Sequence, residues 1–539
     1  MLEHRYTKIG IVIVMLLAVA ACVCAIGFSG QLTQQAEAAV TMDYETALFD
    51  TDTLIEIDII MDEDDWQAML DGALEETYSI CDVTVNGETF YRVGIRPKGN
   101  TSLSAIANDP TTDRYSFKLE FDQYVDGQTC FGLDKLVLNN NYADATNMKE
   151  ALVYDMFQYL DADASLYNYA KISVNGEYWG VYLALEAVED SFLLRNYGLR
   201  SGALYKPEGM QMGGAGGMGG MPEGSMPQPP DSGDFRPGEG FKPEEGFPSG
   251  EDFQPGEDFQ PETMFGLSGI FSSGGADLNY TDDKLSSYQT IWDGAVTKAK
   301  TGEKQRVVTA LKNIAAGNEL ETYMDTDALL RYMAVHIFSV NDDSLSGTMA
   351  HNYYLYEADG KLSLLPWDYN LAFGGMGRTT AESVVNSPID DAFAATDFFD
   401  TLLADETYHS RYYAYLSRLV EEYVDGGGFD AFYERVRSQL DALVETDPTA
   451  FYSYDEYVAA AETLYQVVKL RAQSIRGQLD GSIPSTQHTQ QGAATLIGAQ
   501  GLDISAMGTM QMGAQPQSGE ERAQPRPDAA PTGEERKKR

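Results

Sequence analysis

The strongest constraint on the fold is the order in which the hydrophobic pattern changes along the chain. Residues 53–61, TLIEIDIIM, and residues 115–122, YSFKLEFD, alternate apolar and polar side chains, which is typical of strands with one buried face. Between them, residues 81–99 predict a hairpin that turns at Asn86-Gly87, because this dipeptide tolerates the positive φ of a tight turn. The first part of the chain is therefore predicted to be strand-rich.

A single helix is predicted within this strand-rich part. Residues 145–160, ATNMKEALVYDMFQYL, place Met148, Leu152 and Leu160 on one helical face. Residues 169–188 then predict a second hairpin, which turns at Asn175-Gly176.

The pattern becomes helical in the second half of the chain. Residues 281–340 and 394–480 carry apolar side chains at helical spacing, and a two-strand hairpin around Asp359-Gly360 separates them. A strand-rich part followed by a helix-rich part predicts an α+β fold.

Composition sets the expected boundaries. Residues 207–265 are rich in Gly, Pro and Glu and contain GEDFQP twice, so they cannot bury enough apolar surface to offset chain entropy and predict a disordered insertion. The predicted organisation is a leader at 1–39, an N-terminal part at 40–206, the insertion at 207–265, a C-terminal part at 266–484 and a disordered tail at 485–539.

The N-terminus has the pattern of an export signal. Residues 9–28 contain no charge and follow Arg5 and Lys8. Cleavage near residues 36–40 would release the protein, whereas an uncleaved segment is just long enough to anchor it in a bilayer. VAAC, ending at Cys22, also resembles a lipoprotein cleavage site. We expect an extracytoplasmic protein, secreted or membrane-anchored at the bacterial cell envelope.

Charge and cysteine content exclude some classes of function. The net charge of -46 argues against nucleic acid as a partner, because polyanions repel one another. Beyond the leader only Cys81 and Cys130 remain, which predicts either one disulfide or two buried thiols. The five histidines show no zinc spacing.

Three polar residues at loop and strand edges point to metal and phosphate chemistry. Asp343, Asn352 and Asp368 each offer oxygen, and Mg²⁺ needs only one or two carboxylates with amide, water and substrate phosphate. Their order matches the layout in which protein kinases orient a hydroxyl and hold magnesium. Aspartate and asparagine are also common in turns, so the surrounding residues have to decide between a metal-binding site and ordinary turn residues.

The surrounding motifs resemble those of the spore-coat protein H (CotH) kinase family. They read NDDS at 341–344, HNYYLY at 351–356 and PWDYNLAFG at 366–374, with RPKGNTS at 96–102 upstream. The resemblance covers about residues 50–480 around the insertion. It implies a divergent protein-kinase-like fold that binds ATP with Mg²⁺ or Mn²⁺ and phosphorylates a protein substrate, such as a cell-surface or coat protein.

The resemblance also implies roles for single residues. Asp368 would be the metal-binding aspartate, Asn352 a second metal ligand, and Asp343 the catalytic-loop aspartate that orients the acceptor hydroxyl. Asp342 beside Asp343 leaves a second choice for that role, and Asn370 removes one carboxylate that some members carry near the metal.

The nucleotide-contacting residues are assigned by their place among the strands. Lys118 is the best candidate for the lysine on the nucleotide phosphates, with Glu150 on the following helix as its partner; the alternative is an exposed strand lysine. Arg96 and Lys98 lie where a phosphate-covering loop would be, or at a basic hairpin tip. Glu186 occupies the place of a hinge that contacts adenine.

Two other functions are compatible with the sequence. One is a non-catalytic cell-surface binding or structural protein on a kinase-like scaffold. The other is transfer of a nucleotidyl group in place of phosphate, because kinase-like sites can bind the nucleotide in the reverse direction.

Overall fold

The computed structural model describes residues 39–199, 202–208 and 274–510, except residues 348, 379, 392 and 394. The expected leader segment 9–28, nearly all of the expected insertion and the basic terminus lie outside the described residues. Within the described part of the chain, no helix is both long and apolar enough to cross a membrane.

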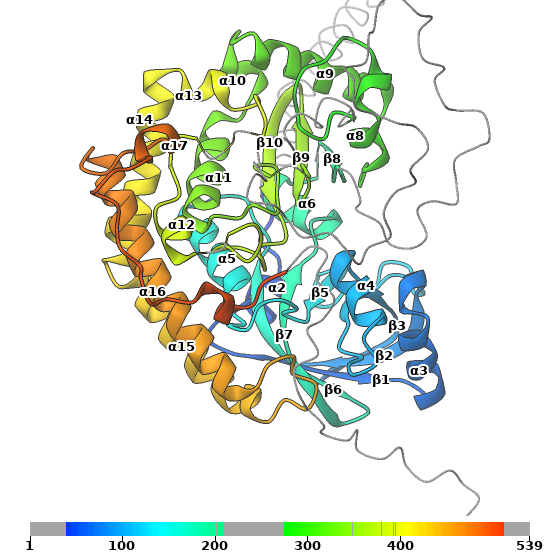
Figure 1. Cartoon of the computed structure of the whole chain (residues 1–539). Helices are drawn as coiled ribbons and strands as arrows, with labels where there is room; N and C mark the ends of the chain where they lie inside the picture. The colour runs from blue at the N-terminus through cyan, green and yellow to red at the C-terminus, as the bar shows by residue number, and fades with distance from the viewer. Residues whose placement is uncertain are drawn as a thin grey trace, which may run out of the picture.

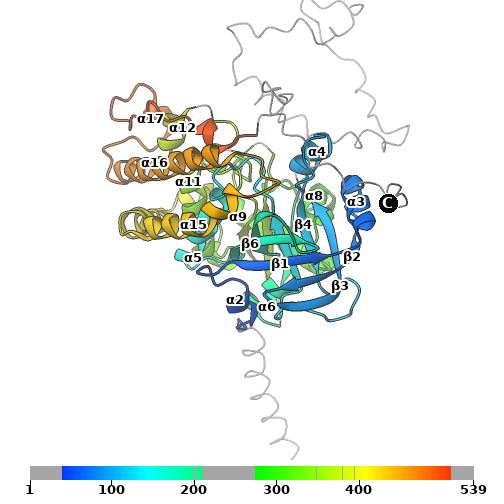
Figure 2. The same cartoon turned by 90° about the horizontal axis from the view of Figure 1, so that it is seen from below.

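The N-terminal part is built around a closed barrel of seven strands (Figures 1 and 2). The strands are β1 (Ile55–Ile60), β2 (Ser79–Val85), β3 (Glu88–Lys98), β4 (Ser116–Glu120), β5 (Lys135–Asn139), β6 (Tyr167–Val174) and β7 (Glu177–Glu186). Their order is β1-β2-β3-β4-β5-β7-β6, and the barrel closes where β1 pairs in parallel with β6. Closure leaves no unpaired sheet edge.

The predicted strand pattern and both Asn-Gly turns are confirmed. Asn86 and Gly87 have φ values of 50° and 86°, and Asn175 and Gly176 have 52° and 83°, as tight hairpin turns require. Inward-facing side chains of the strands form one apolar core.

The cysteine question has one answer in the structure. Cys81 and Cys130 are free, buried thiols in this barrel core. The alternative of a disulfide between them was wrong, and the alternative of two buried thiols is confirmed.

Six short helices accompany the barrel. They are α2 (Tyr44–Ala47), α3 (Glu63–Asp71), η1 (Ala73–Glu75), α4 (Thr101–Ala107), α5 (Lys149–Tyr159) and α6 (Asp190–Tyr197). Helix α5 begins four residues later than predicted, because Asp144 holds a preceding turn. Its carboxylate accepts bonds from the amides of Thr146 and Lys149 at 3.0 Å each. The residues that follow α5 lead back into the barrel.

The C-terminal part combines a small sheet with most of the helices. The sheet order is β10 (Lys361–Pro366), β9 (Tyr353–Ala358) and β8 (Ala203–Tyr205). The helices are η2 (Leu285–Tyr288), α8 (Gln289–Asp293), α9 (Thr301–Ala315), α10 (Leu320–Tyr323), α11 (Thr326–Ser339), α12 (Ala381–Val385), α13 (Asp400–Leu403), α14 (Glu406–Ser417), the π-helix η3 (Arg418–Val424), α15 (Gly428–Glu445), α16 (Tyr454–Leu479), α17 (Gln487–Gln490) and η4 (Ile504–Met507). Helix α11 is capped by Asp325, whose carboxylate accepts a bond from the amide of Ala328 at 3.2 Å.

The expectation of a disordered tail from residue 485 was wrong as far as residue 510. This stretch includes α17 and η4, and it buries Ala499, Ile504 and Met507 against the large core. These apolar residues are spaced irregularly among Gly and Gln, so the sequence gives no periodic signal for them. Residues 511–539 lie outside the described residues.

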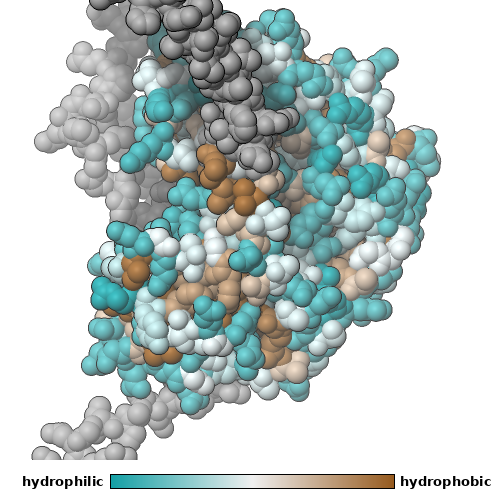
Figure 3. All heavy atoms as spheres, turned by 180° about the vertical axis from the view of Figure 1, so that it is seen from behind, coloured by the Kyte–Doolittle hydropathy of each residue, from teal (hydrophilic) through white to brown (hydrophobic). Residues whose placement is uncertain are grey.

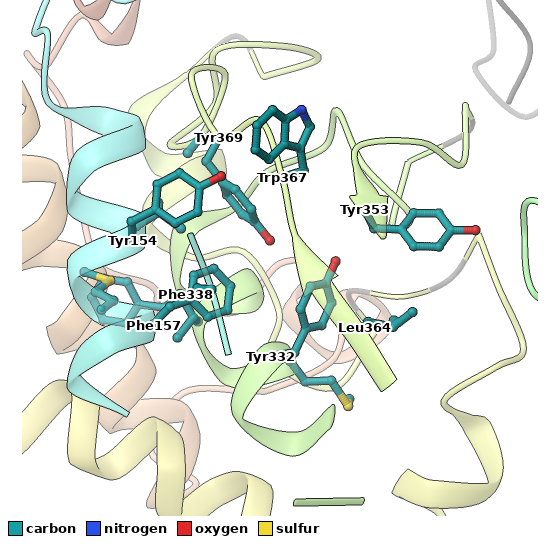
Figure 4. Close-up of a cluster of buried hydrophobic side chains, with 14 of the residues drawn as sticks. Tyr154, Phe157, Tyr332, Phe338, Tyr353, Leu364, Trp367 and Tyr369 are labelled. Carbon is teal, nitrogen blue, oxygen red and sulfur yellow. The ribbon is translucent and has the colours of Figure 1, made fainter. Parts of the chain in front are cut away.

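Aromatic side chains join α5 to the C-terminal part. Figure 4 shows Tyr154 and Phe157 of α5 facing Tyr369, which follows β10. The ring centroids of Phe157 and Tyr369 lie 5.7 Å apart, and those of Phe157 and Tyr332 of α11 lie 6.1 Å apart. The core is therefore continuous from α5 to α11.

The rear face of the molecule is largely hydrophilic with scattered apolar patches (Figure 3).

The structure thus confirms an α+β fold with a strand-rich N-terminal part and a helix-rich C-terminal part.

Candidate functional site

Asp368 lies in a left-handed turn directly after β10. Its φ is 61°, a conformation that non-glycine residues adopt rarely and that often occurs at functional sites. The turn is held on both sides: Asn341 Nδ2 donates to the carbonyl of Asp368 at 3.4 Å, and the amide of Tyr369 donates to Glu150 Oε1 at 3.4 Å. Asp368 is therefore fixed between the loop after α11 and the helix α5.

Asp343 lies on that loop after α11, and its carboxylate has two partners. His351 Nε2 lies 2.8 Å from Asp343 Oδ1, and Asn352 Nδ2 donates to Asp343 Oδ2 at 3.1 Å and to its backbone carbonyl at 2.8 Å. The bond to Asp343 raises the pKa of His351 despite the opposing effect of burial. The structure therefore brings Asp343 and Asn352 into direct contact.

The charge of Asp343 acts on Asp368. Burial raises the pKa of Asp368, against the attraction of Lys98, and the negative charge of Asp343 raises it further. A cation bound at Asp368 would offset this unfavourable burial of negative charge.

Asp342 has a different partner. Its carboxylate accepts bonds from Arg378 Nε at 2.6 Å and Arg378 Nη2 at 3.1 Å. Because this ion pair occupies Asp342, the arrangement favours Asp343 as the aspartate of the site.

A hydrogen-bonded chain connects the barrel to Asp368. Lys98 Nζ, at the end of β3, donates to Asn139 Oδ1 at 2.9 Å, and Asn139 Nδ2 donates to Glu150 Oε2 at 2.8 Å. The other oxygen of Glu150 accepts the amide of Tyr369, next to Asp368. The chain therefore runs from β3 through β5 and α5 to the turn that carries Asp368.

Burial shifts the pKa of Glu150 and of Lys98, the two titratable groups among these hydrogen-bonded residues. Burial raises the pKa of Glu150 to about 8, helped by the charge of Asp368 and opposed by Asn139 and Lys98. Burial also lowers the pKa of Lys98, although Asp368 and Glu150 attract its charge. Lys98 Nζ further lies 5.6 Å from the ring centroid of Trp367.

Lys118 does not meet its predicted partner Glu150. It forms an ion pair with Glu189, which Lys135 also contacts at 2.7 Å. The reason lies in the register of β3 and β4, where Lys118 pairs with Arg96 while Lys98 pairs with Ser116. Two residues along a strand correspond to about 6.6 Å, so Lys98 reaches α5 and Lys118 does not.

Arg96 also has a partner within the barrel part. It pairs with Glu76 and lies over the ring of Tyr78 at 5.4 Å. The reading of residues 96–102 as a hairpin tip was wrong, because β3 leads there into α4.

Glu186 is fully buried, and its carboxylate is occupied. Arg195 donates to it at 2.6 and 3.0 Å, and the hydroxyl of Tyr44 donates at 2.5 Å. Its side chain therefore stabilises the packing of α6 and α2. Its amide donates to the carbonyl of Leu166 at 2.9 Å, so neither the side chain nor the amide is available for the predicted hinge contact.

A buried histidine joins the two aspartate-bearing loops, and no motif or spacing in the sequence indicates this role. His336 Nε2 lies 2.8 Å from Ser346 Oγ and 3.2 Å from Ser344 Oγ, on the loop of Asp343. Its Nδ1 lies 3.1 Å from the hydroxyl of Tyr369, next to Asp368. Burial lowers the pKa of His336 to about 3, so the ring is neutral at ordinary pH.

The donor set fits a divalent metal that is completed by substrate. No group of three or more His, Cys, Asp and Glu side chains is close enough to hold a metal among the described residues. Asp368, Asp343 and the oxygen of the Asn352 amide nevertheless supply the hard oxygen ligands that magnesium takes when phosphate and water fill the other positions.

The comparison with protein families fits this geometry. The family model described as CotH kinase protein matches residues 95–475, which is well over half of the chain. The chain belongs to the CotH kinase family. The match begins in β3 just before Lys98 and ends within α16. It therefore includes the hydrogen-bonded residues Lys98, Asn139 and Glu150 and the turn of Asp368. A search of curated proteins gave no match.

Proposed function

We propose that this CotH kinase family protein is an exported protein kinase that transfers the γ-phosphate of ATP to a protein hydroxyl and depends on Mg²⁺ or Mn²⁺. The observation that carries the proposal is the chain Lys98-Asn139-Glu150, which ends at the amide beside Asp368. It connects Lys98 of β3, Glu150 of α5 and the turn of Asp368. Protein kinases likewise bring together a strand lysine, a helix glutamate and a metal-binding aspartate.

In this proposal the fold is a divergent protein-kinase fold, with the barrel and α5 as the nucleotide-binding part. Lys98 contacts the phosphates, and Asn139 and Glu150 hold its ammonium in place. Asp368 and Asn352 would hold the divalent cation, whose positive charge would offset the negative charge of the transferred phosphoryl group.

Asp343 orients the acceptor. Its carboxylate accepts the proton of the substrate hydroxyl as the oxygen forms a bond to the γ-phosphorus and the bond to the β-γ bridging oxygen breaks, releasing ADP. His351 and Asn352 fix this carboxylate by their contacts with its two oxygens.

Export is proposed from the uncharged segment 9–28 behind Arg5 and Lys8. The substrate is accordingly proposed to be a protein at the cell surface.

The test compares isosteric variants of the purified protein. Asp368→Asn and Asp343→Asn are incubated with labelled ATP and a general acceptor protein, with Mg²⁺, Mn²⁺ or chelator, and intact mass is followed. Asp359→Asn is the matched control, because Asp359 is exposed in the β9-β10 turn and its φ of 51° suits asparagine. We expect metal-dependent gain of one phosphate by wild type and control, and its loss in both site variants.

Other outcomes would refute the proposal in different ways. A mass gain of a whole nucleotide would make the protein a nucleotidyl transferase. Transfer that survives Asp368→Asn would place the chemistry elsewhere. Absence of both transfer and metal-dependent nucleotide binding in the wild type would favour the binding-scaffold function.

A further inference from the structure

The C-terminal segment from residue 497 to residue 510, here called the strap, crosses the molecule toward the site. It continues from α17 along α16 and ends beside α5, as the orange-to-red ribbon shows (Figure 1). Its start is fixed by Asn386, whose side chain bonds both the amide and the carbonyl of Ile497 at 2.9 Å. Met507 in η4 is 1% exposed, so the strap is packed into the core.

The strap contacts the beginning of α5, the helix that carries Glu150. The amide of Ala145 donates to the carbonyl of Met507 at 3.1 Å. Lys149 Nζ donates to the carbonyl of Gly508 at 3.0 Å and to that of Ala143 at 3.3 Å. Because Lys149 is completely buried, the carbonyl of Gly508 satisfies an ammonium group that would be costly to leave unpaired.

Gly508 is required by this close approach. Its φ is 82°, and a Cβ atom there would lie 2.6 Å from the carbonyl oxygen of Ala143. The contacting atom is backbone, so any side chain at residue 508 must push the strap away from α5.

The end of the strap contacts the segment that carries Asp368. The amide of Met510 donates to the carbonyl of Gly375 at 2.9 Å. Gly375 closes the run PWDYNLAFGG, which begins at Pro366. Within four residues, the strap therefore bonds both the helix of Glu150 and the segment of Asp368.

We propose that the strap is a positioning element of the phosphotransfer site, acting through Gly508 and Lys149 on Glu150 and through Met510 on the turn of Asp368. The proposal rests on the proposed kinase function. The strap lies wholly beyond residues 95–475, which the family model matches. Loss of the strap frees the first turn of α5, and Glu150 then no longer holds Asn139, the partner of Lys98, and the Tyr369 amide in place.

The experiment uses the full chain with one substitution in the strap. Gly508→Ala introduces the clash with Ala143, and Gly498→Ala is the matched control, since a Cβ at Gly498 meets nothing within 4 Å. Two truncations, ending at Leu496 and at Met510, remove the strap or leave it whole. Phosphate transfer and amide hydrogen exchange of residues 144–151 and 369–375 are measured in each.

We expect transfer to fall about ten- to hundredfold in Gly508→Ala and in the chain ending at Leu496, because small displacements of a reacting group cost that much. Exchange in both segments should quicken in the same two variants. Gly498→Ala and the chain ending at Met510 should match wild type in both measurements.

The outcomes separate this proposal from the proposed function. Unchanged exchange at residues 144–151 in Gly508→Ala would overturn the positioning role whatever the activity, as would faster exchange with undiminished transfer. If the wild type transfers no phosphate, the kinase function fails and with it the role of the strap in that reaction. Should the chain ending at Leu496 not fold, Gly508→Ala alone decides.

Discussion

Replacing Lys98 or Lys118 by methionine distinguishes two assignments of the phosphate-binding lysine. The sequence favoured Lys118, whereas the structure joins Lys98 to Glu150 through Asn139. A unit charge about 4 Å from a phosphate oxygen contributes about 4 kcal/mol at an effective dielectric constant of about 20. Lys98→Met should therefore lower kcat/KM for ATP by about a thousandfold.

Lys118→Met should have a much smaller effect. It removes an ion pair with Glu189 in which the two side chains are 14% and 23% exposed, and Lys135 remains bonded to Glu189 at 2.7 Å. We expect a loss of about 1 kcal/mol in the free energy of unfolding and a change in kcat/KM below about threefold.

The assay is initial-rate phosphate transfer at varied ATP, with Lys361→Met as the matched control because Lys361 is exposed at the start of β10. Urea unfolding of each variant separates loss of stability from loss of catalysis. The reasoning is refuted if Lys118→Met abolishes transfer while Lys98→Met retains it, since the register of β3 and β4 would then not decide which lysine acts.

Three further predictions follow from the site and the core. Asn139→Leu removes the hydrogen bonds to Lys98 and Glu150 and leaves both buried groups without this partner, so we expect the free energy of unfolding to fall by about 2–4 kcal/mol in urea titrations and transfer to fall with it. Unchanged values would contradict the bridging role. Burial lowers the pKa of folded His336 to about 3, against 6.5 ordinarily, so its contribution to stability is complete above pH 6.5 and is lost as pH falls toward 3. His336→Phe should therefore flatten the decline of the free energy of unfolding between pH 6.5 and 3. An unchanged slope would refute this. Burial raises the pKa of Cys81 to about 12 and raises that of Cys130 as well. Mass spectrometry should therefore find both thiols unmodified by maleimide at pH 8 until the protein is denatured. Labelling of these thiols in the native protein would show that the barrel core is open.

The sequence predicted those features that depend on neighbouring residues. Alternating patterns and Asn-Gly pairs located the barrel strands and their turns, because side-chain period and turn φ values are local properties. The three motifs of residues 341–374 identified the family, and Asp343, Asn352 and Asp368 lie at the ends of elements as expected.

What the sequence could not decide is which residues far apart along the chain come into contact. Lys98 and Lys118 both lie on predicted strands, and only the pairing of β3 with β4 places Lys98 toward α5. His336 reads as one more residue of an apolar helix, although its two ring nitrogens join loops from both sides of the site.

The strap shows the same division between local and tertiary information. Its Gly- and Gln-containing sequence has no periodicity and indicates disorder, yet it is ordered because its few apolar side chains and backbone groups fit surfaces made by α16, α5 and the turn after β10. The sequence by itself determined most of the strands and helices, the family and the candidate aspartates, because those depend on local pattern and motif. The tertiary structure alone decided which lysine is joined to Glu150 and what holds α5. The first follows from the register of β3 with β4, and the second from packing between Lys149 and Gly508, which lie 359 positions apart.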